Sequence, residues 1–366
     1  MYCLNLSYMS HNLSKLILHL KNTLTIGQMH VILPNQQMRT FTGKKKGPTV
    51  TWLIHDWAFI DVLVKEGSIS LSNAYARGFW TTSNLVDFMS ICFQNSSFLQ
   101  FQAKRNSWIA WLVKHLRTEI HSYDFVFDQF IDHCCAEQMG QYRKLLAMQS
   151  KMRILDMGCD GGGFAKFAAR NNHDVTVLTV SKANYQKAKS FLQKDLELER
   201  IRLLYNANPN AMHERYDLIT AMGLFENLRL IDLPHVFQTI KNNLSLTGFA
   251  AIQTLFVPNE AGSYLEKYLF QNNIMLNLNH FKREAAKQGL ELTQVETTGG
   301  AYLSHLEKMY TMIKQHAISE KPADLLKSLE YCCANVIAAL KTGNASIAQI
   351  QLQHAVAKNN VVQLAI

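Results

Sequence analysis

The sequence lacks the long apolar run that a membrane-spanning helix requires. No stretch reaches the roughly 18 consecutive apolar residues of such a helix. Residues 1–20 also do not combine a basic start with an apolar block, which is the pattern of a secretory signal. We therefore expect a cytoplasmic protein in which any contact with a membrane is peripheral.

The spacing of cysteines that marks zinc sites and redox pairs is missing too. The seven cysteines include the adjacent pairs Cys134-Cys135 and Cys332-Cys333, and no two of them are separated by two residues. We expect reduced, mostly buried thiols. The histidines are scattered along the chain, and we propose no metal site.

Acidic residues are fewer than basic ones. Asp and Glu number 28 against 37 Lys and Arg, which gives a formal net charge of +9 and a pI near 9.1. Excess positive charge favours a polyanionic partner, either a nucleic acid or an anionic membrane surface. Charge alone does not choose between these two partners.

Internal repeats and low-complexity tracts are absent as well. The 366 residues, 48% of them hydrophobic, suffice for two domains of roughly 100 to 200 residues each. Near the start, apolar and polar residues alternate over 23–41 on both sides of Pro34-Asn35, which predicts a hairpin. Two short helices are predicted after it, over 58–65 and 84–93.

A basic amphipathic helix is predicted over 101–120. Apolar residues recur there at helical spacing, with lysines, arginines and the tryptophans Trp108 and Trp111 among them. Such a helix can lie on a membrane surface, although a connecting helix packed between domains is the simpler interpretation. We place the connecting helix at 101–122, between an amino-terminal domain of residues 1–100 and a carboxyl-terminal domain of residues 123–366.

Strands alternate with helices in the carboxyl-terminal domain. The strand-like segments are RILDMGC, DVTVLTV, RIRLLY, YDLITAM and FAAIQTLF. This alternation predicts an α/β architecture with a parallel sheet and crossover helices. A further helix is predicted over 279–288, a strand over 290–297 and a long helix over 325–340.

The run RILDMGCDGGGFAKFAA indicates a buried strand, a glycine-dense turn and a helix. A turn this tight needs positions without a Cβ atom, and the start of the helix offers backbone N–H groups to a polar ligand. A dinucleotide-binding loop would read G-x-G-x-x-G, whereas here Asp156 precedes Gly158, and Cys159 and Asp160 follow it. This arrangement is typical of S-adenosylmethionine-dependent methyltransferases, and we expect such a domain over residues 150–256.

Three motifs together resemble the cyclopropane-fatty-acyl-phospholipid synthase and mycolic acid cyclopropane synthase family. LDMGCDGGG resembles that family's LDIGCGWGG, TVSKANYQKA resembles TISxEQxxxA, and YDLITAMGLFEN resembles FDxIVSxGMFEH. The stretch IHDWAFIDVLVKEGSISLSNAYARGFWTTSNLVDFM is similar to the family's amino-terminal domain, which methyltransferases in general do not have. The similarity covers residues 25–357 in all. It includes three further segments: LEKYLFQN, residues 300–309, and residues 332–349, which match the family's last helix.

The resemblance implies a Rossmann-like class I methyltransferase domain and a smaller α+β amino-terminal domain on the lipid side. It implies S-adenosylmethionine as cofactor and, as partner, anionic membrane phospholipids with unsaturated acyl chains at the inner face of the membrane. A homodimer and a heterodimer both stay open. The cofactor-binding residues that it implies are Tyr123, Asp156, Gly158, Cys159, Gly162, Gly163, Thr179, Ser181 and Asn184. Thr179 and Ser181 also fit a simple strand end and helix cap.

In the implied reaction the alkene of an acyl chain attacks the cofactor's methyl group, and the resulting carbocation loses a proton to close a ring. The family holds a bicarbonate base with a glutamate, a histidine and a tyrosine. Glu226 matches the glutamate and Tyr302 the tyrosine. Gln253 stands at the histidine position, 253 − 226 = 27 residues after Glu226. A glutamine donates a hydrogen bond but does not titrate.

Other departures from the family concern the catalytic pocket. The family's cysteine segment is missing, its HYDLGND is SYDFVFD, and its tryptophan after the glycine turn is Gly161. Two hypotheses follow: an active enzyme that adds a methyl or methylene group to unsaturated phospholipid chains, or a catalytically silent partner subunit that binds lipid or cofactor. A nucleic-acid methyltransferase would fit the positive charge but not the amino-terminal domain.

Overall fold

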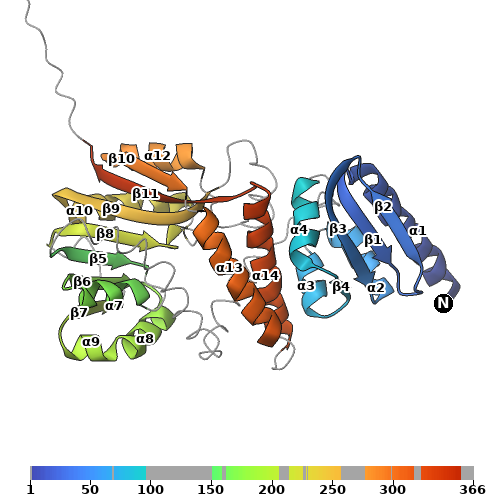
Figure 1. Cartoon of the computed structure of the whole chain (residues 1–366), viewed down its shortest axis with the longest axis horizontal. Helices are drawn as coiled ribbons and strands as arrows, with labels where there is room; N and C mark the ends of the chain where they lie inside the picture. Colours follow the sequence, from blue (N-terminus) through green and yellow to red (C-terminus); the bar gives the residue numbers. More distant parts are fainter. Residues whose placement is uncertain are drawn as a thin grey trace, which may run out of the picture. The chain divides into compact units, whose positions relative to one another are not determined.

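The computed structural model describes residues 2–67, 70–95, 151–158, 162–205, 214–225, 228, 230–256, 277–297, 299–316 and 323–355 (Figure 1). The chain forms two compact units. Unit 1 comprises Met1–Phe127, Glu260–Asn272 and Gly299–Ser346, and unit 2 comprises Asp128–Asn259, Asn273–Thr298 and Ile347–Ile366. The boundaries expected from the sequence around residues 100 and 122 lie outside the described residues, and so does the basic helix expected over 101–122.

Unit 1 is built on a four-stranded sheet in the order β2-β1-β3-β4. Strands β1 (Ile26–Ile32) and β2 (Met38–Thr42) pair antiparallel, which confirms the predicted hairpin. β3 (Lys45–Ile54) runs parallel to β1 and antiparallel to the short β4 (Trp80–Thr82). The sequence analysis missed β3. It also missed helix α1 (Tyr2–Thr23), which comes before β1.

Within its described residues, unit 1 has five more helices: α2 (Trp57–Glu66), α3 (Ser70–Ala76), α4 (Leu85–Gln94), α13 (Gly299–His316) and α14 (Ala323–Lys341). The predicted helices at 58–65, 84–93 and 325–340 are therefore confirmed. Asn84 caps α4, because its side chain accepts the N–H of Asp87. Helix α14 packs on α3, α4 and α13. The two carboxyl-terminal helices thus complete the first unit, whereas the sequence analysis grouped them with residues 123–366.

An aromatic cluster forms the core of unit 1. The rings of Trp52 and Trp80 lie 5.9 Å apart and are fully buried. Beside Trp80, the hydroxyl of Tyr75 donates to the buried carboxylate of Glu330 at 2.9 Å. Burial, reinforced by the Glu330 charge, raises the pKa of Tyr75 well above its usual value, so this hydroxyl stays a donor. The contact ties α3 to α14.

Unit 2 is built on a seven-stranded sheet in the order β10-β11-β9-β8-β5-β6-β7. The strands are β5 (Arg153–Met157), β6 (Asp174–Thr179), β7 (Ile201–Tyr205), β8 (Tyr216–Met222), β9 (Leu244–Phe256), β10 (Leu290–Thr297) and β11 (Ser346–His354). β5 to β9 pair in parallel and β10 pairs antiparallel with β11. The predicted parallel sheet and the strand at 290–297 are confirmed.

Helices cover both faces of this sheet. They are α7 (Gly163–Arg170), α8 (Lys182–Phe191), α9 (Gln193–Glu197), α10 (Leu233–Asn243) and α12 (Leu278–Lys287), with the 3-10 turn η6 (Leu230–Asp232) before α10. Because side chains alternate along a strand, Ile154 packs with α7 and Leu155 with α10 and α12. The result is a three-layer α/β unit, as expected from the sequence.

One element boundary expected from the sequence is wrong. The last helix does not continue to Gln349, because α14 ends at Lys341 and Gln349 lies on strand β11. Gly343 follows the helix end with φ +72, a left-handed conformation that glycine adopts without strain and that commonly ends helices. Beyond it, Ala348, Ile350 and Leu352 are buried at a spacing of two, which is the pattern of a strand.

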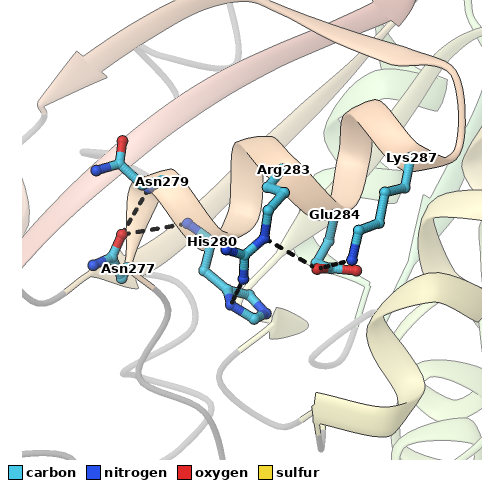
Figure 2. Close-up of polar contacts among 6 residues, drawn as sticks. All are labelled: Asn277, Asn279, His280, Arg283, Glu284 and Lys287. Atoms are coloured by element: carbon cyan, nitrogen blue, oxygen red, sulfur yellow. Dashed lines mark hydrogen bonds and ion pairs between the residues drawn. The ribbon is translucent and has the colours of Figure 1, made fainter.

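Helix α12 shows how local sequence fixes a helix on the sheet (Figure 2). The Asn277 side chain accepts the backbone N–H groups of Asn279 at 2.7 Å and His280 at 3.3 Å, so it caps the first turn. In the last turns the buried carboxylate of Glu284 accepts a hydrogen bond from Lys287 at 2.8 Å. This contact holds the pKa of Glu284 below its usual value.

Replacing this carboxylate should destabilise the fold in a pH-dependent way. A carboxyl group whose pKa is lower in the folded state stabilises the protein above its unfolded pKa, and that contribution disappears as the pH falls through the folded pKa. At neutral pH, Glu284→Gln should lower the free energy of unfolding by about 0.5 kcal/mol, because the Lys287 side chain is largely exposed and water weakens the ion pair. Urea unfolding at neutral and acidic pH measures the difference between variant and wild type.

Glu291→Gln is the matched control, because Glu291 is exposed on β10 and has no ion pair in the described part of the chain. Its effect on stability should be near zero at every pH. A deficit for Glu284→Gln that stays the same at acidic pH would contradict the assigned contact.

Candidate functional site

The candidate site lies at the edge of the unit 2 sheet where the parallel strands end. Parallel strands present their carboxyl ends at one edge, which is where open α/β sheets bind ligands. In the register Asp156 of β5 is level with Thr220 of β8, and Thr220 is level with Ala251 of β9. Gln253 follows Ala251 by two residues, so Asp156, Thr220 and Gln253 face the same side of the sheet.

Asp156 is held in place by a buried hydrogen bond. Its side chain is almost entirely buried, and Oδ1 accepts a hydrogen bond from Oγ1 of Thr220 at 2.7 Å. A buried carboxylate is costly unless it is hydrogen-bonded. The contact therefore fixes an acceptor group one residue before the end of β5, directly ahead of the glycine turn.

The glycine turn requires the absence of side chains at two described positions. Gly158 has φ +82, and a Cβ atom there would lie 2.9 Å from Cδ1 of Leu224. Gly162 has φ +95, and a Cβ atom there would lie 2.7 Å from Cδ1 of Leu192. Both conformations are strained for any residue other than glycine. We call these two glycines, which pack against Leu224 and Leu192 at the sheet edge, the cradle.

The start of helix α7 offers hydrogen-bond donors beside this cradle. Gly162 is the N-cap residue and has no side chain to accept a backbone N–H, and Gly163 is the first helical residue. The first N–H groups of a helix have no partner within the helix, and the helix dipole makes this end positive. The end of α7 can therefore bind a polar or negatively charged group of a ligand.

At the end of β6 the candidate side chains make local contacts. Oγ1 of Thr179 accepts the N–H of Ser181 at 3.2 Å, and Oγ of Ser181 accepts the N–H of Asn184 at 3.2 Å, which caps helix α8. The helix-cap interpretation of Ser181 is thus present in the structure. Each hydroxyl still has its own O–H to donate, so the cofactor-binding roles of Thr179, Ser181 and Asn184 stay predictions.

Val180 is a residue at this edge that the sequence analysis missed. It lies between Thr179 and Ser181, and 74% of its surface is exposed. Nearby along the same edge, Tyr205 at the end of β7 is also exposed and packs on Tyr185 with ring centroids 5.4 Å apart. An apolar residue directly after the second parallel strand was the available signal. These exposed side chains give the edge an apolar surface next to its polar groups.

Gln253 is buried and is held by two hydrogen bonds. Its main-chain carbonyl accepts the N–H of Gly223 at 3.0 Å, and its Oε1 accepts a hydrogen bond from Nε2 of Gln349 at 3.3 Å. Gly223, with φ +69, is the first residue after β8, and Glu226 follows it by three residues. Gln253 is therefore anchored to the start of the segment that carries the predicted catalytic glutamate.

Other predicted site residues fall outside what the structure describes. These residues are Tyr123, Cys159 and Glu226. Tyr302 lies in helix α13 of unit 1, with its side chain outside the described part. Asp156, Gly158, Gly162, Thr179 and Gln253 are thus brought to one sheet edge, while the predicted catalytic roles of Glu226, Gln253 and Tyr302 stay predictions.

Metal sites and membrane spans are two other classes of feature that the described residues could form. Among these residues, no three His, Cys, Asp or Glu side chains gather as metal ligands. Within the same residues, no helix is both long and apolar enough to cross a membrane. Cys92, Cys332 and Cys333 carry free thiols in unit 1, and burial raises the pKa of Cys332 to about 12.

Curated relatives include lipid-modifying enzymes. Cyclopropane-fatty-acyl-phospholipid synthase of Escherichia coli strain K12 is 23% identical over 252 residues, which cover 59% of this chain and 64% of that enzyme. A probable fatty acid methyltransferase of Mycobacterium tuberculosis is 20% identical over 221 residues, covering 55% and 52%. The chain thus spans less than two thirds of the length of these relatives.

Solved structures share the fold of unit 2. The cyclopropane synthase MmaA2 of Mycobacterium tuberculosis has a TM-score of 0.51 and 18% identity, covering 59% of this chain and 83% of that one. The mycolic acid cyclopropane synthase CmaA1 complexed with SAH and CTAB has a TM-score of 0.52 and 17% identity, covering 59% and 84%. At these identities the likeness shows the class I methyltransferase fold alone, as expected from the sequence. The family model for mycolic acid cyclopropane synthetase matches residues 128–350, which is more than half of the chain. The chain therefore belongs to the mycolic acid cyclopropane synthetase family.

Proposed function

We propose that the protein is an S-adenosylmethionine-dependent methyltransferase that adds a methyl or methylene group to unsaturated acyl chains of membrane phospholipids. The observation that carries this proposal is the buried Asp156 beside the cradle of Gly158 and Gly162, in a chain of the cyclopropane synthetase family. The named activities of the curated relatives supply the substrate class.

The described residues fit a sulfonium nucleoside cofactor. Gly158 and Gly162 allow the left-handed backbone that takes the chain from the end of β5 to the start of α7, at the sheet edge where a ligand would bind. The α7 start provides N–H donors, the Asp156 carboxylate provides an acceptor, and the exposed Val180 provides an apolar contact. S-adenosylmethionine, when bound, supplies an electrophilic methyl group.

The remaining task of the chain is to assist a poor nucleophile. An alkene reacts only if it is aligned with the methyl group and if water is kept from the cation that forms. Phe225 and Phe256 pack against Phe281 in the apolar layer under α10 and α12, so they belong to the core of unit 2 and we assign them no part in the reaction.

Ring closure requires a base that removes a proton. Gln253, which stands at the family's histidine position, cannot serve as this base. The amide of Gln253 donates hydrogen bonds and does not titrate, so its role is to hold an anion. A bound bicarbonate is the base that the family resemblance implies, and Gln253 is the described residue of unit 2 that would donate a hydrogen bond to it. The chemistry of the Gln253 donor fits such an oxyanion.

Transfer of labelled methyl groups tests the proposed function. The full-length protein is incubated with methyl-labelled S-adenosylmethionine and vesicles of an unsaturated anionic phospholipid, and the lipid is analysed for label and for a mass gain of one CH₂ group. Vesicles of the saturated counterpart are the control, because they lack the alkene. Label in the unsaturated lipid alone supports the proposal. Cofactor binding without any transfer would refute it and favour a catalytically silent, cofactor-binding partner subunit.

Membrane association is expected to be peripheral and electrostatic. Lys44, Lys45 and Lys46 are exposed where β2 leads into β3, and no ion pair in the described part of the chain involves them. A basic residue near an anionic surface contributes about 1 kcal/mol, or about fivefold in binding. Replacing all three with glutamate should therefore weaken vesicle binding by roughly 100-fold at low salt, as measured by co-sedimentation.

A matched control changes the same charge elsewhere. Lys189, Lys194 and Arg200 are exposed on unit 2, and their replacement with glutamate should weaken binding much less than the change at 44–46. Raising the ionic strength should release the wild type, because salt screens exposed charges. Binding that ignores both salt and anionic lipid content would count against peripheral electrostatic association at the inner face of a membrane.

A further inference from the structure

Two glutamine side chains meet on neighbouring strands of unit 2. Gln253 lies on β9 and Gln349 on β11, which is next to β9 in the sheet. Nε2 of Gln349 donates a hydrogen bond to Oε1 of Gln253 at 3.3 Å. The neighbours of Gln349 along the strand, Ala348 and Ile350, face the apolar layer under α10 and α12. Gln349 therefore points to the opposite side of the sheet, which is also the side of Asp156.

The contact fixes which end of the Gln253 amide is available to a ligand. A primary amide has one oxygen that accepts and one nitrogen that donates. Gln349 engages the oxygen, and the hydrogen bond from Gly223 fixes the main chain of the same residue. Gln253 is consequently restrained at two points, and its amide nitrogen is left to donate to another group.

Glu296, the neighbour of Gln349 on strand β10, is consistent with an amide of Gln349 whose nitrogen donates to Gln253. Glu296 of β10 lies opposite Gln349 in the antiparallel register, and its Oε1 accepts a hydrogen bond from Gln294 at 2.6 Å. Opposed residues of this kind have their side chains within reach of each other. A carboxylate only accepts hydrogen bonds, so beside it the nitrogen of Gln349 is preferred over the oxygen. The same nitrogen is the atom that faces Gln253.

We propose that Gln349 is a positioning residue that holds the amide of Gln253 with its N–H group presented to a small oxyanion, of which bicarbonate is the expected one. This inference rests on the proposed function and deepens it. Gln349 acts through Gln253 and does not touch the reacting atoms. In this arrangement the amide of Gln253 binds the anion and the amide of Gln349 orients it, and neither of them contributes a titrating group.

Exchanging the donor of Gln349 for an acceptor tests the inference. In Gln349→Glu the carboxylate can only accept, so Gln253 must turn its nitrogen toward residue 349 and present its oxygen to the oxyanion. Gln351→Glu is the matched control: Gln351 lies two residues further along β11, on the same face, and is opposite Gln294. It places the same charge on the same strand without replacing the partner of Gln253.

Two measurements on the full-length protein separate the inference from the proposed function. The first is the bicarbonate concentration that half-saturates labelled methyl transfer to unsaturated vesicles. For Gln349→Glu it should rise roughly tenfold or more, the effect of losing a hydrogen bond to a charged group. Binding of S-adenosylhomocysteine should stay unchanged, and Gln351→Glu should behave as the wild type.

The second measurement needs no activity. Protein labelled with ¹⁵N-glutamine gives a side-chain amide signal for Gln253, identified by its loss in Gln253→Glu. Bicarbonate should shift this signal in the wild type and in Gln351→Glu, but not in Gln349→Glu. If this pattern holds while no methyl transfer occurs, the positioning role stands and the proposed function fails. If transfer and the bicarbonate response are the same in Gln349→Glu as in the wild type, the positioning role is overturned and the proposed function stands.

Discussion

Gly158→Val is expected to weaken binding of S-adenosylhomocysteine by at least roughly 100-fold, because strain and crowding of the cradle act together. A side chain at φ +82 adopts a left-handed conformation that L-residues rarely take, and its Cβ atom would lie 2.9 Å from Leu224. The valine would therefore displace Leu224 and shift the backbone of the turn away from the conformation that the ligand needs. Isothermal titration calorimetry on both proteins measures the change.

Gly289→Val controls for backbone strain without touching the sheet edge. Gly289 has φ +75, and a Cβ atom there would meet only the end of the Lys241 side chain, at 3.1 Å from Nζ. That end can move away at little cost, so this variant should lose stability but keep its affinity for the ligand. Thermal unfolding of each variant shows that the titrated protein is folded. Wild-type affinity in folded Gly158→Val would disprove the cofactor site.

Gln253→His is expected to raise methyl transfer to unsaturated phospholipid by roughly 100-fold, the lower end of what a general base contributes. A neutral imidazole accepts a proton, which the amide does not, and Gln349 can still donate to one of its nitrogens. Transfer by the variant should also fall as the pH drops through about 6.5, the usual pKa of histidine. Glutamine at position 253 confers no such pH dependence. The pH profile therefore shows whether the histidine raises the rate as a base or only by packing better.

Glu226→Gln is the companion variant, and it should reduce transfer in both backgrounds while leaving S-adenosylhomocysteine binding intact. According to the family resemblance, the carboxylate of Glu226 holds the bicarbonate base. Glutamine removes the charge of this side chain at nearly constant size. Transfer that survives Glu226→Gln would contradict the carried-over catalytic residues. An unchanged rate for Gln253→His, in protein that binds cofactor, would show that residue 253 does not limit the reaction.

The cofactor edge could be predicted from sequence because its signals are local. Asp156, Gly158 and Gly162 stand within seven residues, and a tight turn between strand and helix requires glycine whatever the distant chain does. The parallel sheet followed for a similar reason, since each strand and its crossover helix carry their own periodicity. The structure confirms the parallel sheet and places Asp156, Gly158 and Gly162 at its edge, while their cofactor-binding roles stay predictions.

The pairing of Gln253 with Gln349 could not be predicted in the same way. The two residues are 96 positions apart, and they meet only because β11 inserts between β9 and β10. The similarity to the family's last helix also hid β11, although Gly343 and the alternation of Ala348, Ile350 and Leu352 were visible in the sequence. Helices α13 and α14 joined the first unit for a related reason: α14 packs on α3 and α4, which lie more than 200 residues earlier, and α13 packs on α14.

The insertion of β11 between β9 and β10 has a consequence for how the protein folds during synthesis. Strand β10 is made before β11, yet it reaches the sheet only through β11. Until Ser346–His354 has left the ribosome, β9 is an open edge whose unpaired backbone groups can pair with another chain. The nascent protein is therefore exposed to aggregation at β9 while helices α13 and α14 are being made, and the arrival of β11 pairs this edge.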